Sequence, residues 1–185
     1  MSRLQVLDDI KIKLALLRGR DPHYQVFGAN VHRYRMSAPL SEEQVEAFEE
    51  QYGVTLPAGY RDFLLNVGGG GAGPYYGVLP LGYHKAALPL LAQPFPHTSD
   101  WNEDDLPDDD YFSDELIRGA MRICNTGDGG YELLVVTGAA SGTLWADGRY
   151  ANQGLMPLPH SRDPLLPMDF LDWYMDWLDR SLNGE

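Results

Sequence analysis

Apolar residues near both ends of the chain recur at steps of three and four, which is the spacing of one buried helix face. The N-terminal series is Leu4, Leu7, Ile10, Leu14 and Leu17. The C-terminal series is Phe170, Leu171, Tyr174, Trp177 and Leu178. The first series predicts a helix over residues 4–17 that ends near Gly19. The second predicts an amphipathic C-terminal helix, with its aspartates mostly off the apolar stripe.

A third helix is predicted to begin at Ser41, which can cap its N-terminus while Gln44 completes a capping box. Leu40 and Val45 have the spacing of a hydrophobic staple across that start, and Gly53 ends the helix. The residues expected on its buried side are Val45, Phe48 and Tyr52.

The next helix is predicted to start at or near Pro57, whose fixed φ suits a first helical position. Its apolar face consists of Tyr60, Phe63, Leu64 and Val67. We expect a C-cap with positive φ at Gly68, followed by a flexible turn into a strand.

Runs of β-branched and aromatic residues predict strands around residues 75–81, 120–124, 131–137, 142–146 and 153–158. A loop of small residues joins the third and fourth runs, which indicates a hairpin. Residues 18–39 are predicted to be a long connection with room for a short strand. Helices first, then sequential strands, then a terminal helix predict an α+β fold. We expect a single antiparallel-dominated sheet with helices packed on one face.

Five glycines occur within residues 68–73, and Gly68, Gly70 and Gly73 satisfy the G-x-G-x-x-G fingerprint of dinucleotide binding. That fingerprint must follow a strand and open a helix, so that backbone amides at the helix N-terminus reach a pyrophosphate. Here a helix precedes the glycines and a strand-like run follows them. The context therefore favours a turn over a nucleotide site, and no Gly-Lys-Ser or Gly-Lys-Thr is present.

The length of 185 residues and a hydrophobic content of 44% fit one domain over residues 1–185 with a real core. No stretch approaches the roughly 20 apolar residues of a membrane span, and charges interrupt the N-terminal apolar positions. We therefore expect a cytoplasmic protein without signal peptide or anchor. The single cysteine, Cys124, excludes an intrachain disulfide and any cysteine-based metal cluster.

The net charge of −13 argues against a general electrostatic footprint for nucleic acid or anionic membrane, and it permits a basic partner. Nine carboxylates and no lysine or arginine lie in DWNEDDLPDDDYFSDE, residues 100–115; removing those nine from −13 leaves −4. This segment is either a solvated loop or a surface that faces something positive.

Candidate chemistry is sparse. The five histidines include no pair at i and i+4, so the sequence predicts no metal site, and no cofactor motif occurs. The D-x-D-x-F-x-D run at residues 108–114 lacks ligands and the glycine of an EF-hand loop. Cys124 is expected to be a small buried residue at a strand end rather than a nucleophile, and Ser141 is not in a G-x-S-x-G motif. These features favour a binding module over an enzyme.

The order of four segments resembles the SUKH superfamily, specifically its Smi and Knr type. These segments are LSEEQVEAFEEQYGVTLPAGYRDFLLNVGGGGAG, PYYGVLPL, GDGGYELLVVTGAASGTLWADG and FLDWYMDWL. The resemblance covers residues 38–182 and leaves residues 1–37 as an N-terminal helix and connection. It implies an α+β fold without catalysis. Many bacterial members of the superfamily are immunity proteins that bind and neutralise a cognate toxin, whereas fungal members are scaffolds in cell-wall signalling.

The resemblance supplies no catalytic residue, so the candidate contacts come from charge and residue type. An acidic immunity protein can cover the basic cleft of a toxin by mimicking phosphate charge. The candidate contact residues are Glu103, Asp104, Asp105, Asp108, Asp109 and Asp110, with Trp101 and Tyr111 as aromatic anchors. Tyr75 and Tyr76 form a second candidate face beside the glycine run, although at least one of them is expected to pack in the core.

Two alternatives to an immunity protein remain at this point. One is a scaffold or regulatory protein with an endogenous partner. The other is a small enzyme that uses the glycine loop and a nearby acid.

Overall fold

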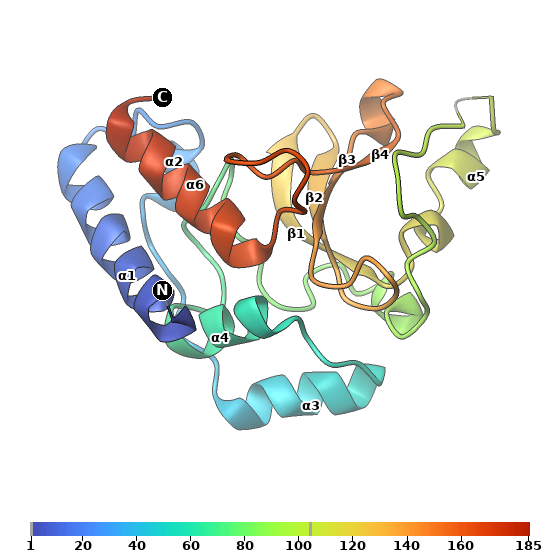
Figure 1. The fold of residues 1–185 in the computed structure, drawn as a ribbon, viewed down its shortest axis with the longest axis horizontal. Coiled ribbons are helices and arrows are strands. Elements are labelled where there is room, and N and C mark those ends of the chain that lie inside the picture. The colour runs from blue at the N-terminus through green and yellow to red at the C-terminus, as the bar shows by residue number, and fades with distance from the viewer. Residues whose placement is uncertain (1, 104) are drawn as a thin grey trace.

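The computed structural model describes residues 2–103 and 105–185 (Figure 1). The helices are α1 (Arg3–Arg20), α2 (Ala29–His32), α3 (Glu42–Tyr52), α4 (Ala58–Asn66), α5 (Asp108–Tyr111) and α6 (Phe170–Asn183). The strands are β1 (Ala120–Gly127), β2 (Gly130–Val135), β3 (Leu144–Asp147) and β4 (Leu155–Pro157). Three short 3₁₀ turns are η1 (Leu88–Leu90), η2 (Asp114–Ile117) and η3 (Arg149–Ala151).

The four strands form one antiparallel sheet in the order β1-β2-β3-β4, so each strand pairs with its neighbour in sequence. The hairpin that the sequence predicts between residues 131 and 146 is the β2–β3 pair, with Leu133 opposite Trp145. The predicted α+β fold is confirmed.

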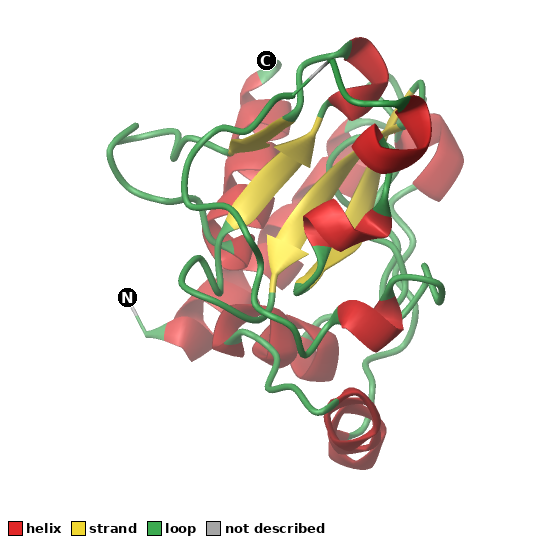
Figure 2. Cartoon of the chain, turned by 90° about the vertical axis from the view of Figure 1, so that its right-hand side faces the viewer, coloured by secondary structure: helices red, strands yellow, loops and turns green. Residues whose placement is uncertain are grey.

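Side chains of β2 alternate between the two faces of the sheet, as the period of a strand requires. Leu134 belongs to a large apolar cluster that also contains the buried faces of α1, α4 and α6. Leu133 and Val135 belong to a smaller cluster with Trp145 and Phe95. Figure 2 shows helices behind the sheet and loops with short helices in front of it. The layer of α1, α4 and α6 thus covers one face, while the segment before β1 covers the other.

The helices follow their predicted patterns. Leu7, Ile10, Leu14 and Leu17 are buried in α1, and an ion pair between Lys13 and Asp179 connects it to α6. The capping box of Ser41 and Gln44 is present at the start of α3. Gly53 ends that helix with a left-handed φ of 64°.

The predicted strand over residues 75–81 is wrong. Val78 makes isolated bridges to Gly71 and Cys124, but its neighbours do not continue them into a strand. Tyr75 and Tyr76 lie in a turn that the Gly77 amide closes by donating to the Pro74 carbonyl at 2.9 Å. Turn residues on both sides therefore outweigh the β preference of the tyrosines.

The predicted C-cap at Gly68 is also wrong. Val67 is the C-cap of α4, and positive φ values occur later, at Gly70 and Gly71. Gly68 lacks a side chain for a steric reason instead, since a Cβ there would lie 2.7 Å from the Met36 Cε and 2.8 Å from the Ser37 carbonyl oxygen.

The amides of the glycine run are engaged within the protein. Gly69 donates to the Ala38 carbonyl at 3.1 Å, Gly71 to Val78 at 2.9 Å and Ala72 to Arg35 at 2.8 Å. The amides of Gly69 and Ala72 support the packing of the run against residues 35–38, where Met36 also bridges Gly71. A phosphate cradle needs free amides that converge on the ligand, and these three point at carbonyl groups instead.

Candidate partner-binding surfaces

The carboxylates that the sequence singles out lie on α5 and the loop before it (Figure 1). We call the exposed ones the acidic face: Glu103, Asp105, Asp108, Asp109 and Asp110. Asp104, the sixth predicted contact, lies outside the described residues. Within the part of the chain that the structure describes, no member of the acidic face forms an ion pair. Their charge is therefore directed at solvent or at a partner.

The two predicted aromatic anchors lie beneath the acidic face. Tyr111 is only 3% exposed, and its ring stacks on that of half-buried Trp101 with centroids 5.7 Å apart. The Tyr111 hydroxyl donates to the Asn102 Oδ1 at 2.7 Å, while Trp101 and Leu155 exchange backbone hydrogen bonds. This placement suits residues that support the segment better than residues that a partner touches.

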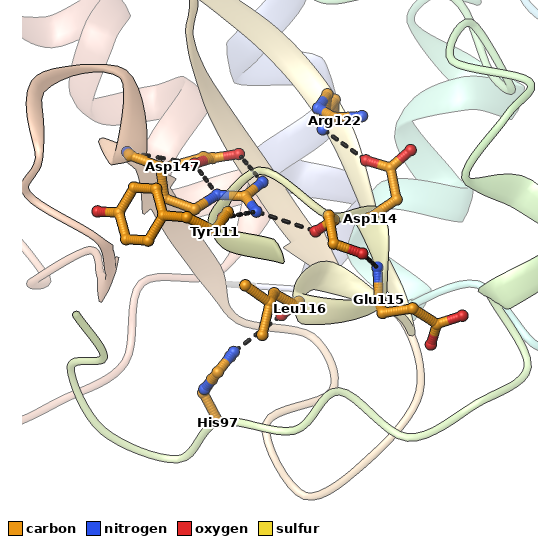
Figure 3. A network of polar contacts seen from close by, with 9 residues as sticks. His97, Tyr111, Asp114, Glu115, Leu116, Arg122 and Asp147 are labelled. Atoms are coloured by element: carbon orange, nitrogen blue, oxygen red, sulfur yellow. Dashed lines mark hydrogen bonds and ion pairs between the residues drawn. The ribbon is translucent and has the colours of Figure 1, made fainter. Parts of the chain in front are cut away.

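A buried arginine, Arg149, also holds the segment that carries the acidic face. Figure 3 draws its hydrogen bonds, which include those to Asp147 and Tyr111. The Arg149 guanidinium, 2% exposed, donates to both carboxylate oxygens of Asp147 at 2.8 and 2.7 Å. Its Nη1 donates to the carbonyls of Tyr111 and Ser113, both at 3.0 Å. A fork-shaped donor is suited to bind a carboxylate and two carbonyls at once. Arg149 thereby connects the end of β3 to the last residue of α5 and to the chain just after it.

Two further contacts fix the same segment (Figure 3). Asp114 forms an ion pair with Arg122 of β1 at 2.8 Å. The His97 Nε2 lies 2.8 Å from the Leu116 carbonyl and donates to it, because a carbonyl only accepts. Burial lowers the pKa of His97, which keeps the ring neutral near neutral pH. Sequence analysis missed Arg149, Asp114 and His97 as anchors, because their partners lie in other elements or are backbone carbonyls.

The second candidate face contains three exposed aromatic rings. Tyr75 and Tyr76 are 39% and 40% exposed, so the expectation that at least one packs in the core is wrong. Both contact Phe27, which is 62% exposed, at centroid distances of 6.1 and 5.5 Å. We call Phe27, Tyr75 and Tyr76 the aromatic patch. Phe27 was missed because nothing local ties residue 27 to the glycine run.

A pocket of about 680 Å³ opens beside the aromatic patch. Residues 25–27, the turn at Pro74 and Tyr75, the C-terminal half of α6 and Glu132 of β2 form its walls. Glu132 is 5% exposed, and its Oε2 has no hydrogen-bond partner among the described residues. Burial raises the pKa of the Glu132 carboxyl to about 7, although a hydrogen bond from the Trp173 side chain lowers it.

Two features that the sequence leaves open, a metal-ligand cluster and a reactive cysteine, can be examined in the described residues. In the described ranges, no three His, Cys, Asp or Glu side chains are placed to hold a metal ion. Cys124 is fully buried inside β1, and its thiol donates to the Pro74 carbonyl at 3.2 Å. Burial raises the pKa of Cys124, which disfavours the nucleophilic thiolate. Over the residues that the structure describes, no helix is long and apolar enough to cross a membrane.

The meander sheet, with helices on one face and an acidic segment on the other, defines an α+β fold with two candidate surfaces. The chain belongs to the SMI1/KNR4 family (SUKH-1), whose model matches residues 39–154. The match begins before α3, includes the acidic face and β1 to β3, and ends before β4. It is shorter than the resemblance over residues 38–182 and leaves α1 and α6 outside. Neither a curated protein nor a solved structure matches the chain significantly.

Proposed function

We propose that this chain is a non-enzymatic protein-binding domain that acts as an immunity protein, neutralising a cognate bacterial toxin by direct binding in the cytoplasm. Membership of the SMI1/KNR4 family carries the proposal, because it is consistent with an immunity or regulatory domain. The toxin would present a basic surface, and the acidic face would be the contact.

The form of the acidic face supports this role. Its five exposed carboxylates form no ion pair with the described part of the chain, so their field extends toward an approaching partner. The segment that carries them is held by Arg149, by the Trp101–Tyr111 stack and by the Asp114–Arg122 ion pair. A surface that is already held in place loses less conformational entropy on binding.

The test is co-expression with the candidate toxin encoded by a neighbouring gene, followed by kinetic binding measurements on the purified pair. The test variant carries Asp108→Asn, Asp109→Asn and Asp110→Asn. The matched control carries Glu43→Gln, Glu46→Gln and Glu50→Gln on α3, which removes the same charge from another exposed helix surface. We expect wild type and control to rescue growth. The test variant should lose about tenfold in association rate at low salt, since steering charges act mainly on that step.

Two results would change the assignment. Rescue and binding that are identical in the test variant and the control would keep the immunity role but remove the acidic face from the contact. A neighbouring product that is neither toxic nor bound would instead favour a regulatory protein with an endogenous partner.

A further inference from the structure

The pocket beside the aromatic patch lies on the helix-covered side of the sheet, opposite the acidic face. Its volume of about 680 Å³ is within the usual range of small-ligand sites, roughly 300–1,000 Å³. Segments far apart in sequence converge on it: the loop before α2, the end of the glycine run, β2 and α6. The site is therefore a product of the tertiary fold and lies apart from the surface assigned to the toxin.

Glu132 is the unusual residue of this pocket. It points to the same face of β2 as Leu134, a position that the alternation of the strand assigns to the core. Within the described residues, no cation pairs with its carboxylate, and one oxygen has no hydrogen-bond partner. A buried carboxylate without a counter-charge is costly, so a residue of this kind favours a cationic occupant.

Aromatic rings form much of the remaining wall. Trp173 and Trp177 come from α6, Phe27 from the loop before α2 and Tyr75 from the glycine-run turn. The faces of indole and phenol rings attract cations within about 6 Å of their centroids, and Trp is the strongest of them. A pocket with apolar walls and the Glu132 carboxyl suits an alkyl chain that ends in a positive charge.

The charged groups around Glu132 also favour a cationic occupant. Asp176 and Glu185 also line the pocket, and Arg180 is the basic residue there. Arg180 is exposed and extends toward Asp176, at 3.8 Å, so it does not neutralise Glu132. Tyr75 and the Cys124 thiol are the other titratable groups close to the Glu132 carboxyl, and neither is cationic. The C-terminal end of α6, which carries partial negative charge, adds to this preference.

We propose that this pocket binds an organic cation, an alkyl guanidinium or alkyl ammonium group, with the charge beside Glu132 and the alkyl chain against Trp173 and Trp177. The group can belong to a free small molecule or to an arginine or lysine side chain of a protein. The test below separates these two sources.

Calorimetric titration of the full chain with capped amino acids tests the proposal. The probes are N-acetyl-arginine amide and N-acetyl-lysine amide, and N-acetyl-citrulline amide is the neutral isostere of the arginine probe. We expect at least one cationic probe to bind, and arginine to bind about tenfold or more tightly than citrulline if guanidinium is preferred. Affinity for the cation should rise between about pH 6 and pH 8, because the Glu132 carboxyl loses its proton over that range.

Glu132→Gln keeps the shape of the side chain and should abolish both the preference for a cation and its pH dependence. Glu46→Gln, an exposed change on α3, should retain both. If neither the arginine nor the lysine probe binds wild type more tightly than citrulline does, or if neither cation shows saturable binding, the proposal is overturned without recourse to any variant. A Gly-Ser-Arg-Ser-Gly peptide that binds more tightly than the capped amino acid would identify a protein side chain as the source. Equal affinities of the peptide and the capped amino acid would identify a free small molecule as the source.

Discussion

Arg149 and Glu132 are both buried charged residues, but their surroundings are opposite. Arg149 directs four donor contacts to Asp147 and to two backbone carbonyls, so its charge is paired and its hydrogen bonds are made. Glu132 is nearly as buried but has no cationic partner in the described chain. A paired buried charge is compatible with a structural role, whereas an unpaired one reduces stability unless something else compensates it. Arg149 therefore holds the acidic segment in place. Glu132 marks the pocket that we propose as a binding site for a cation.

Glu132 gives a prediction about stability and pH. Its pKa is raised from 4.5 in the unfolded chain to about 7 in the folded protein, so the folded state binds the proton more tightly. The free energy of unfolding should therefore fall as pH rises from about 4.5 to 7, by roughly 2 to 3 kcal/mol. In Glu132→Gln this decrease should be absent, as measured by urea denaturation at several pH values.

The quantity to compare is the difference in the free energy of unfolding between wild type and Glu132→Gln at each pH. Burial lowers the pKa of His32, His84 and His97, and these groups favour the folded state as pH rises. They occur in both proteins and cancel in the difference. If wild type and Glu132→Gln show parallel pH profiles, the carboxyl is not held in a buried, unpaired state.

At the level of elements, α3 and the acidic segment differ in what holds them. The start and end of α3 depend on Ser41, Gln44 and Gly53, all of which are local. The acidic segment contains only the single-turn helix α5, and its position depends on Trp101 and Arg149. Local capping made α3 predictable from sequence. The place of the acidic segment is determined by long-range contacts.

Arg149 gives a prediction about this element. Arg149→Met should lower the free energy of unfolding by about 3 to 5 kcal/mol, because it leaves Asp147 buried without its partner. The change should also increase hydrogen exchange of backbone amides over residues 101–115. Urea denaturation and exchange measured by mass spectrometry check the two effects.

A double variant separates pairing from packing. Asp147→Asn with Arg149→Met removes both charges, and it should cost less than the sum of the single changes because the unpaired carboxylate is gone. Full additivity of the two single changes would show that the ion pair contributes nothing to holding the segment.

The whole molecule combines a strongly acidic surface with a second site on the other side of the sheet. The net charge of −13 is concentrated in residues 100–115, and the described carboxylates of the acidic face are exposed. Exposed charges are screened by salt, whereas a buried group such as Glu132 is screened much less. The two surfaces should thus respond differently to ionic strength.

If the proposed toxin is the partner, its association rate should fall by about tenfold or more between 0.05 and 0.5 M salt, because the Debye length shortens. Binding of N-acetyl-arginine amide to the pocket should change much less over the same range. Stopped-flow kinetics and calorimetry at matched salt concentrations check this contrast. An association rate that does not depend on salt would exclude electrostatic steering by the acidic face.

The sequence by itself determined the elements whose signals are local: α1, α3, α4 and α6 from apolar spacing and caps, and the β2–β3 hairpin from its flanking β-rich runs. It also showed where along the chain the acidic segment lies, because charge can be read directly from the residues. It failed at residues 75–81, where the β preference of Tyr75 and Tyr76 competed with the turn residues Pro74 and Gly77.

Only the tertiary structure decided how distant residues meet. Arg149 contacts the carbonyl of Tyr111 across 38 positions, and Glu132 shares a pocket with Phe27 and Trp177. Neither arrangement leaves a periodic or local signal, because both depend on which face of the sheet a side chain occupies and on what packs above it. Secondary structure here follows from neighbours in sequence, whereas the candidate sites follow from the packing of the sheet against its two layers.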